Sequence, residues 1–89
     1  MEGYIGQMMD FAGNFCPRDW AWADGKVLPV QQYPALYSIL GNRFGGDGHT
    51  TFSLPDERLV DSEGRKHYGF QMGRPTRIIC VNGIYPDRE

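Results

Sequence analysis

The sequence predicts a small single α+β domain of short, mostly antiparallel strands, with one short helix and long shaped loops. The chain has 89 residues, which is a typical length for one domain and allows only a small core. Twelve glycines and six prolines interrupt it too often for a helix bundle. Aromatic residues make up 13% of the chain and supply a large apolar area for that core. We expect residues 1–89 to form this one domain.

The first predicted strand spans residues 4–11. The apolar residues Ile5, Met9 and Phe11 occupy positions of the same parity, and only Met8 interrupts the alternation. We therefore expect Ile5, Met9 and Phe11 to share one face of the strand.

A hairpin is predicted over residues 20–28. Trp20 and Trp22 alternate with alanines, so both indole rings belong on one face. Asp24-Gly25 follows, and this dipeptide is typical of a tight turn between two paired strands.

The one predicted helix spans residues 33–40. Pro34 suits the first turn, where the missing N–H has no intrahelical acceptor to lose. Leu36 and Leu40 lie four positions apart on an apolar stripe, and Gly41 stands where a helix end needs a positive φ angle. A helix this short is unstable alone, so we expect it to be docked by that stripe.

A glycine-rich loop at residues 44–49 and a strand at residues 50–54 come next. The glycines follow a helix and precede a strand, which is the reverse of the order found in phosphate-binding loops. We interpret the loop as a structural turn, and we expect Phe52 and Leu54 to point into the core.

The last third of the chain contains a polar segment and an apolar one. Residues 57–75 carry charges of both signs, which predicts a solvated loop or an exposed hairpin. Residues 76–86 include a β-rich apolar run and are predicted to form a closing strand that pairs with the N-terminal strand.

Charge and hydropathy exclude several classes of function. The formal net charge is −2, so the chain offers little basic surface for the phosphates of a nucleic acid. No apolar run approaches the roughly 18 residues of a membrane helix, and Met1-Glu2-Gly3-Tyr4 does not begin a secretory signal. We expect no nucleic acid and no membrane as partners, and synthesis in a cytoplasm without a signal peptide.

Cysteine and histidine are too sparse to indicate a catalytic or metal site. Cys16 and Cys80 are far apart and fit either two free thiols or one long-range disulfide. His49 and His67 add no short ligand spacing of the kind that zinc sites show. Neither thiol has a neighbouring cluster of positive charge to activate it, and the carboxylates stand mostly in turns. We expect no catalytic residue, no metal and no cofactor.

The aromatic residues leave two interpretations open. Rings such as Trp20 and Trp22 can build the core, or they can stack sugars on an exposed face. In so small a chain the core is the more ordinary place for them.

Several ordered blocks at matching spacing make residues 4–56 resemble the phage tail collar domain family. That family includes modules of phage tail fibres and the so-called microcystin-dependent proteins of bacteria. The blocks are Phe11-Ala12-Gly13, Pro17, Trp20, Asp24-Gly25, residues 35–41, residues 44–52 and Leu54-Pro55-Asp56. The residues that carry the structural motif are Phe11, Gly13, Pro17, Trp20, Asp24, Gly25, Leu36, Gly41, Gly45, Gly46, Asp47, Gly48, Thr51, Phe52, Pro55 and Asp56.

The resemblance implies a structural or attachment component of a phage or phage-like tail, in a fibre or at the tail tip. Its partners would be further copies of itself, in a homo-oligomer such as a trimer, or other tail proteins, and its location would be the virion. Two alternatives remain: a module that binds a host-surface glycan or receptor, and a small phage effector that binds a host protein.

The resemblance also assigns residues 57–75 to the position of a variable insert, here a shortened loop. The candidates for partner contact are His49, Arg65, His67 and Tyr68.

Overall fold

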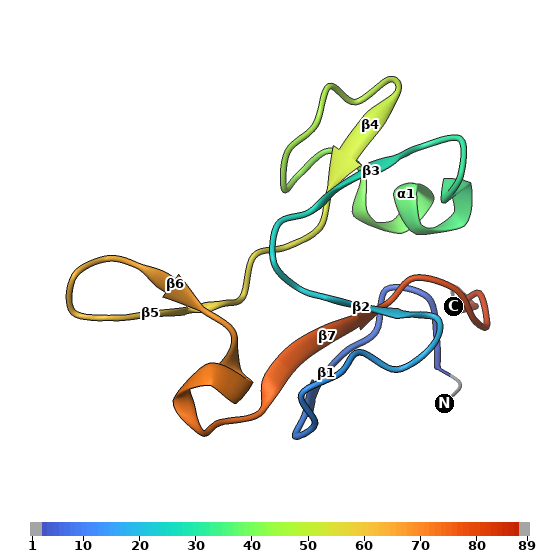
Figure 1. Cartoon of the computed structure of the whole chain (residues 1–89). Coiled ribbons are helices and arrows are strands. Elements are labelled where there is room, and N and C mark those ends of the chain that lie inside the picture. The colour runs from blue at the N-terminus through green and yellow to red at the C-terminus, as the bar shows by residue number, and fades with distance from the viewer. Residues whose placement is uncertain (1–2, 88–89) are drawn as a thin grey trace.

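The computed structural model describes residues 3–87, so both ends of the expected 1–89 domain lie outside the described residues. It confirms the predicted α+β class, with short antiparallel strands and one α-helix. Figure 1 shows three parts: a three-stranded sheet, a two-stranded sheet beside the helix, and a two-stranded hairpin that projects away from both.

The larger sheet combines strands from the N-terminal and the C-terminal parts of the chain. It contains β1 (Met8–Phe11), β2 (Trp20–Trp22) and β7 (Thr76–Cys80), in the order β1-β7-β2 with antiparallel neighbours. The predicted pairing of the closing strand with the N-terminal strand is confirmed. The closing strand is also the central one, because its other edge pairs with β2 and places Trp20 opposite Cys80.

The two faces of β7 contribute to two hydrophobic clusters, as the alternation of side chains along a strand requires. Ile79 belongs to the cluster that the helix covers, whereas Ile78 and Cys80 pack with Trp20 on the opposite face. The buried members of the helix-side cluster are Ile5, Leu28, Leu36, Leu40, Phe52, Leu54, Ile79 and Val81. Trp20 and Trp22 both contact the second cluster, which confirms that they share a face.

The smaller sheet pairs β3 (Val27–Pro29) with β4 (Thr51–Ser53) and lies beside helix α1 (Pro34–Leu40) (Figure 1). The helix was predicted within one residue. Its side chain Leu36 and the β4 side chain Phe52 are both fully buried. The apolar stripe therefore docks the helix, as its short length demands.

The predicted hairpin over residues 20–28 is wrong. β2 pairs with β7 and β3 pairs with β4, so the chain passes from one sheet to the other at Asp24-Gly25. The Gly25 N–H donates to the Pro55 carbonyl instead of closing a turn with β2, and Asp24 forms an isolated bridge with Asp56. Strands distant in sequence outcompete the local turn signal here.

The first strand is shorter than predicted and begins at Met8 rather than Tyr4. Gly6 has a φ angle of +89°, which places a turn before the strand. The turn separates the face of Ile5 from the face of Met9, so these side chains join different clusters. Met8, the apparent interruption, packs against the helix-side cluster, to which Ile5 belongs.

The segment expected to be a loop or an exposed hairpin contains both a hairpin and a 3-10 helix. The arm, as we call residues 59–67, consists of β5 (Leu59–Val60), a turn and β6 (Lys66–His67), and η1 (Gly69–Met72) follows it. The closing strand ends at Cys80, short of the expected residue 86, and beyond it Ile84 forms an isolated bridge with Tyr4.

Candidate functional site

Three aromatic rings mark the place where the arm meets the larger sheet. The Tyr68 and Phe70 rings are nearly parallel, 7° apart, with centroids separated by 5.5 Å. Trp22 of β2 lies 5.8 Å from the Tyr68 ring and 5.4 Å from the Phe70 ring. All three side chains are half-buried. These rings, which we call the arm-base rings, attach the arm to the sheet while part of each ring remains in contact with solvent.

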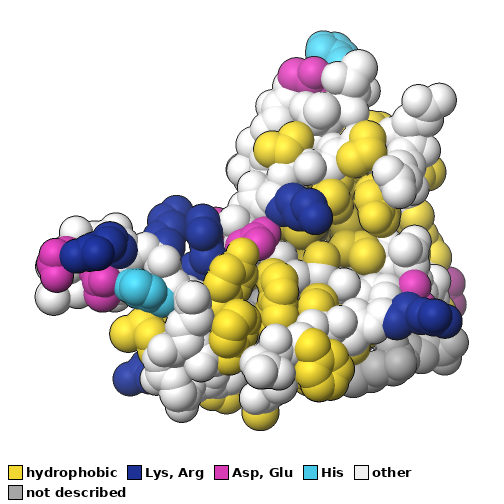
Figure 2. Space-filling model, viewed as in Figure 1, with side chains coloured by type: hydrophobic (Ala, Val, Ile, Leu, Met, Phe, Trp, Pro, Cys, Tyr) yellow, Lys and Arg dark blue, Asp and Glu magenta, His cyan; other side chains and the backbone are white. Residues whose placement is uncertain are grey.

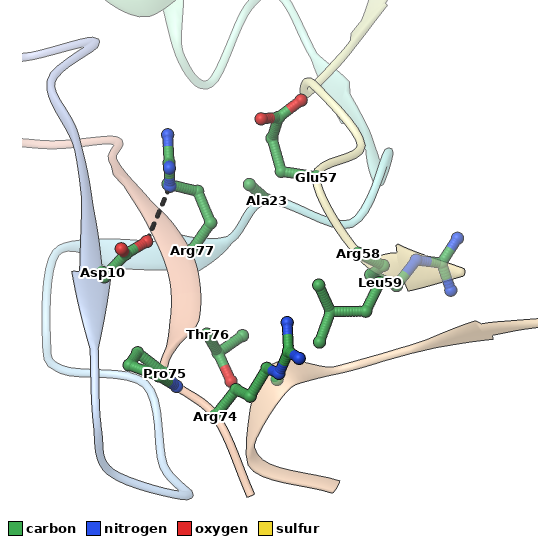
Figure 3. A pocket seen from close by; sticks show the side chains of 10 residues that line it. Asp10, Ala23, Glu57, Arg58, Leu59, Arg74, Pro75, Thr76 and Arg77 are labelled. Carbon is green, nitrogen blue, oxygen red and sulfur yellow. Dashed lines mark hydrogen bonds and ion pairs between the residues drawn. The ribbon is translucent and has the colours of Figure 1, made fainter. Parts of the chain in front are cut away.

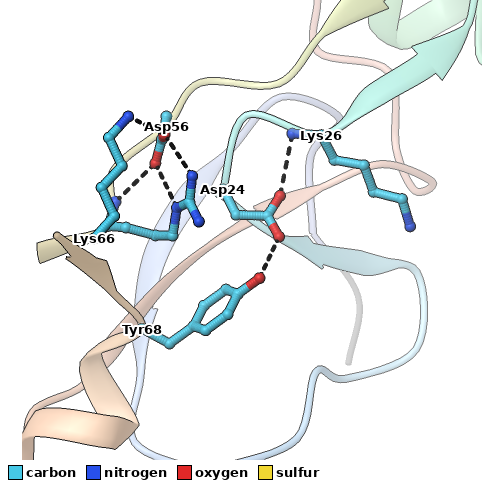
Figure 4. A network of polar contacts seen from close by, with 6 residues as sticks. Asp24, Lys26, Asp56, Lys66 and Tyr68 are labelled. Atoms are coloured by element: carbon cyan, nitrogen blue, oxygen red, sulfur yellow. Dashed lines mark hydrogen bonds and ion pairs between the residues drawn. The ribbon is translucent and has the colours of Figure 1, made fainter.

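A polar network lies beside the Tyr68 ring (Figure 4). The Tyr68 hydroxyl donates a 2.7 Å hydrogen bond to the Asp24 carboxylate, whose other oxygen accepts the Lys26 backbone N–H. Nearby, the Asp56 carboxylate pairs with the Arg58 guanidinium at 2.9 Å and with the Lys66 ammonium at 2.7 Å. Asp24 and Asp56 thus hold the arm in place.

The electrostatics follow from these contacts. Hydrogen bonds from Arg58 and then Lys66 hold the pKa of Asp56 well below its usual range, so Asp56 is ionised at neutral pH. The hydrogen bond to Asp24 raises the pKa of Tyr68, because the phenolate form would lose that bond and meet a like charge. The Arg58 guanidinium also lies 6.0 Å from the Tyr68 ring centroid, in cation–π range.

The turn at the end of the arm is organised by one carboxylate. Asp61 accepts the backbone N–H groups of Glu63 and Arg65, and its second oxygen lies 2.7 Å from His67 Nε2. The bond to His67 and then the bond from the Arg65 N–H lower the pKa of Asp61. Glu63 and Arg65 form an ion pair at 2.6 Å that remains largely exposed. The tip, as we call residues 61–65, therefore displays one exposed charge of each sign in addition to the half-buried Asp61 carboxylate.

A cleft of about 250 Å³ opens beside the arm base (Figure 3). Its lining residues are Asp10, Ala23, Glu57, Arg58, Leu59, Gly69, Arg74, Pro75, Thr76 and Arg77. Arg77 and Asp10 form an ion pair of 2.8 Å across neighbouring strands. Within the described part of the chain, the side chains of Glu57 and Arg74 make no hydrogen bond or ion pair. The cleft therefore presents two unpaired charges of opposite sign.

The glycine-rich loop is held by the Asp47 carboxylate, as its interpretation as a structural turn requires. The Thr50 hydroxyl and the backbone N–H groups of Thr51, His49 and Thr50 all donate to it, which holds its pKa well below the usual range. The Tyr37 hydroxyl of α1 donates to the Gly48 carbonyl at 2.8 Å and fixes the loop to the helix.

The predicted contact residues fall in two places. Arg65, His67 and Tyr68 belong to the arm and its base, whereas His49 is exposed on the loop before β4, in another part of the fold. Figure 2 shows charged side chains of both signs gathered over the projecting arm and hydrophobic side chains over the sheet next to it. Among residues 3–87, no group of three potential metal ligands is present.

Two residues of this region carry signals that sequence reasoning missed. Phe70 follows Tyr68 at a spacing of two, in a segment judged only by its charge. Arg58 lies two positions after the motif residue Asp56, where a bidentate pair closes easily. Arg74 gives no such local signal, because only the fold brings it to the cleft.

Both cysteines are free thiols, so of the two alternatives the disulfide is not formed. Cys80 is fully buried and Cys16 is half-buried against the same hydrophobic cluster. Burial raises the pKa of each thiol, and the charge of Asp24 raises that of Cys16 further.

The fold and the surface define a small α+β structural module whose polar residues organise loops and an arm. The chain matches the Phage Tail Collar Domain family over residues 6–59, and it belongs to that family. No curated protein and no solved structure matches it. The motif residues named above lie within the match, whereas β6, η1 and β7 lie beyond it.

Membership of this family suggests a structural role in a phage tail fibre, with association to other tail proteins or to further copies. The family is structural and is not known for catalysis. It implies a location in the virion tail. None of the helices in residues 3–87 is long and apolar enough to cross a membrane.

Proposed function

We propose that the protein is a structural component of a phage or phage-like tail that assembles by protein–protein contacts through its arm. The observation that carries this proposal is the arm itself. It projects from both sheets (Figure 1), and it extends past the end of the family match at residue 59. An element that begins where the match to the family ends is suited to contacts specific to this tail.

The physics of a short hairpin supports the proposal. A two-stranded hairpin without further strands is only marginally stable in water. The strands of the arm have two residues each, and Val60 is 62% exposed. A partner that pairs with the open edges and covers Val60 would supply the missing burial.

A second apolar area lies near the two described ends of the chain. Tyr4 and Ile84 form a bridge there, and they are 55% and 45% exposed. Tyr85 beside them is 51% exposed, although its hydroxyl shares a hydrogen bond with Ser38. Exposed apolar side chains that cluster in this way are typical of interaction surfaces.

Light scattering of the purified chain over a range of concentrations tests the proposal. We expect a mass that is a multiple of 10.1 kDa, three times that value for a trimer, or specific binding to purified tail-fibre proteins of the same phage. A chain that stays monomeric at every concentration and binds none of those proteins contradicts it.

Binding of a host-surface glycan is a second candidate function, favoured by the stacked Tyr68 and Phe70 rings. Sugars stack on aromatic faces, and charged groups such as Arg58 beside the rings can bind hydroxyl groups. A panel of immobilised glycans, probed with the protein and with Phe70→Ala, tests this candidate. It requires binding that the substitution weakens, and the absence of binding to any glycan contradicts it.

A further inference from the structure

We propose that the tip of the arm of one copy occupies the cleft at the arm base of the next copy, in a head-to-tail contact. This inference rests on the proposed function and names the surface through which self-assembly occurs. The occupant is therefore a second copy of this chain, and the tip residues Glu63 and Arg65 are the groups that enter.

An occupant of the cleft needs charges of both signs. Glu57 and Arg74 lie apart in the cleft (Figure 3), and neither side chain has a partner within residues 3–87. Covering an unpaired charge is costly unless the partner supplies the opposite charge. An apolar or singly charged segment would leave at least one of these two groups without a partner.

The tip carries the complementary pair. Glu63 and Arg65 are two positions apart, and their side chains are 69% and 68% exposed. Their mutual ion pair is a surface pair, which contributes little to stability. Exchanging it for a Glu63–Arg74 contact and an Arg65–Glu57 contact between copies therefore loses little and neutralises both charges of the cleft.

The tip is also shaped before it binds. Asp61 holds the backbone N–H groups of Glu63 and Arg65, at 2.8 and 2.9 Å. Binding therefore does not have to order the turn, and less conformational entropy opposes association.

The size of the cleft agrees with side chains as its occupant. Its volume of about 250 Å³ is below the roughly 300–1,000 Å³ of pockets that enclose small-molecule ligands. Side chains from a turn can fill such a cleft, while the backbone of the turn remains outside it.

The topology requires the contact to be between copies. The arm leads away from the cleft at its base, so the tip of a chain lies remote from its own cleft (Figure 1). A contact between two different surfaces is heterologous, and it closes into a ring when the rotation between neighbours permits.

Charge reversal tests the contact. The variants are Glu63→Arg at the tip, Arg74→Glu in the cleft, and the double variant, with the association constant measured by light scattering and sedimentation. Each single reversal places like charges together and should weaken association about tenfold or more. The double variant should recover most of the affinity, because the two exchanged charges again have opposite signs. Arg18→Glu is the matched control, an exposed arginine outside the arm and the cleft, and it should leave association unchanged.

The other outcomes separate this contact from the function it rests on. Oligomers that survive both single reversals, or single defects that the double variant does not rescue, overturn the contact and leave self-assembly intact. A monomer that binds another tail protein overturns the contact but not the structural role. A monomer without any tail partner overturns both. Circular dichroism of each variant shows whether it is folded, and an unfolded variant is replaced by Glu63→Gln or Arg74→Gln.

Discussion

The Tyr68 hydroxyl donates a 2.7 Å hydrogen bond to the Asp24 carboxylate, across a separation of 44 positions in the chain. Asp24 lies where the chain passes from the larger sheet to the smaller one, and Tyr68 begins the segment after the arm. The bond therefore connects the arm base to the junction between the two sheets. The Asp24 carboxylate thus holds structure on both sides of this junction.

Replacing Tyr68 with phenylalanine removes this bond and keeps the ring stack. We expect Tyr68→Phe to lower the free energy of unfolding by about 1 kcal/mol, because a half-buried bond to a carboxylate is partly replaced by water. Urea unfolding followed by tryptophan fluorescence measures the change. Tyr4→Phe is the control, since Tyr4 is exposed and no hydrogen bond of its hydroxyl occurs within the described residues. Equal stability of the two variants would show that the bond contributes nothing.

The backbone of the glycine-rich loop depends on Gly46 for two reasons. Its φ angle is +91°, and a Cβ atom there would lie 2.4 Å from the Phe52 Cα and 2.7 Å from the Thr51 carbonyl oxygen. Backbone cannot move aside as a flexible side chain can. We expect Gly46→Ala to cost about 3 kcal/mol or more, from steric overlap and backbone strain together.

Gly73→Ala separates these two contributions. Gly73 also has a positive φ angle, +69°, but nothing lies within 4 Å of its added Cβ. Its substitution should cost only the strain of a left-handed residue, about 1 kcal/mol. Thermal unfolding of both variants checks the order, and a Gly46→Ala variant as stable as Gly73→Ala would contradict the close approach.

Local sequence patterns predicted the helix and the core positions well, for physical reasons. Pro34 at the first turn, the stripe through Leu36 and Leu40, and the positive φ angle of Gly41 are all fixed within a few residues. The same is true of the Asp47 carboxylate, whose hydrogen bonds within the glycine-rich loop reach no further than four positions. Elements that depend on neighbours in the chain can be inferred from the chain.

Elements that depend on distant segments could not be inferred in this way. Asp24-Gly25 has the composition of a hairpin turn, but β2 finds its partner in β7 and β3 finds its partner in β4. The cleft depends on the same long-range pairing, because Arg74 precedes β7 whereas Glu57 follows β4. The candidate contact residues on the arm could be recognised from the charge of that segment. That His49 lies in another part of the fold could be learned only from the structure.

The lowered pKa values of two carboxyl groups predict a loss of stability in acid. The pKa of Asp47 in the folded state lies well below its ordinary value of 3.8, and that of Asp61 is also lowered. Their contribution is complete above the unfolded pKa and is lost as the pH falls through the folded pKa. We therefore expect the melting temperature to hold from neutral pH down to about pH 5 and then to fall.

Asp47→Asn isolates one of these groups. The variant should melt below the wild type at pH 7, and the difference should begin to shrink below about pH 4, because Asp47 of the unfolded wild type then takes up a proton whereas folded Asp47 stays ionised. Asp87→Asn is the control and should follow the wild type, since Asp87 is exposed near the end of the described chain. A difference that stays constant between pH 7 and pH 3 would contradict the lowered pKa of Asp47.

The two thiols should react slowly and in a fixed order. The thiolate is the reactive form, and burial raises the pKa of Cys80 and of Cys16, so little thiolate is present at neutral pH. Half-buried Cys16 should react first with an aromatic disulfide reagent, whereas Cys80, with no exposed surface, should wait for unfolding of the sheet. The absorbance of the released thiolate measures both phases, and Cys16→Ser should abolish only the earlier one.

Because Cys80 lies opposite Trp20 in the central pairing of the sheet, the rate at which Cys80 reacts reports the opening of β2 from β7. Rapid reaction of both thiols in the folded protein would mean that this sheet opens far more readily than its burial implies.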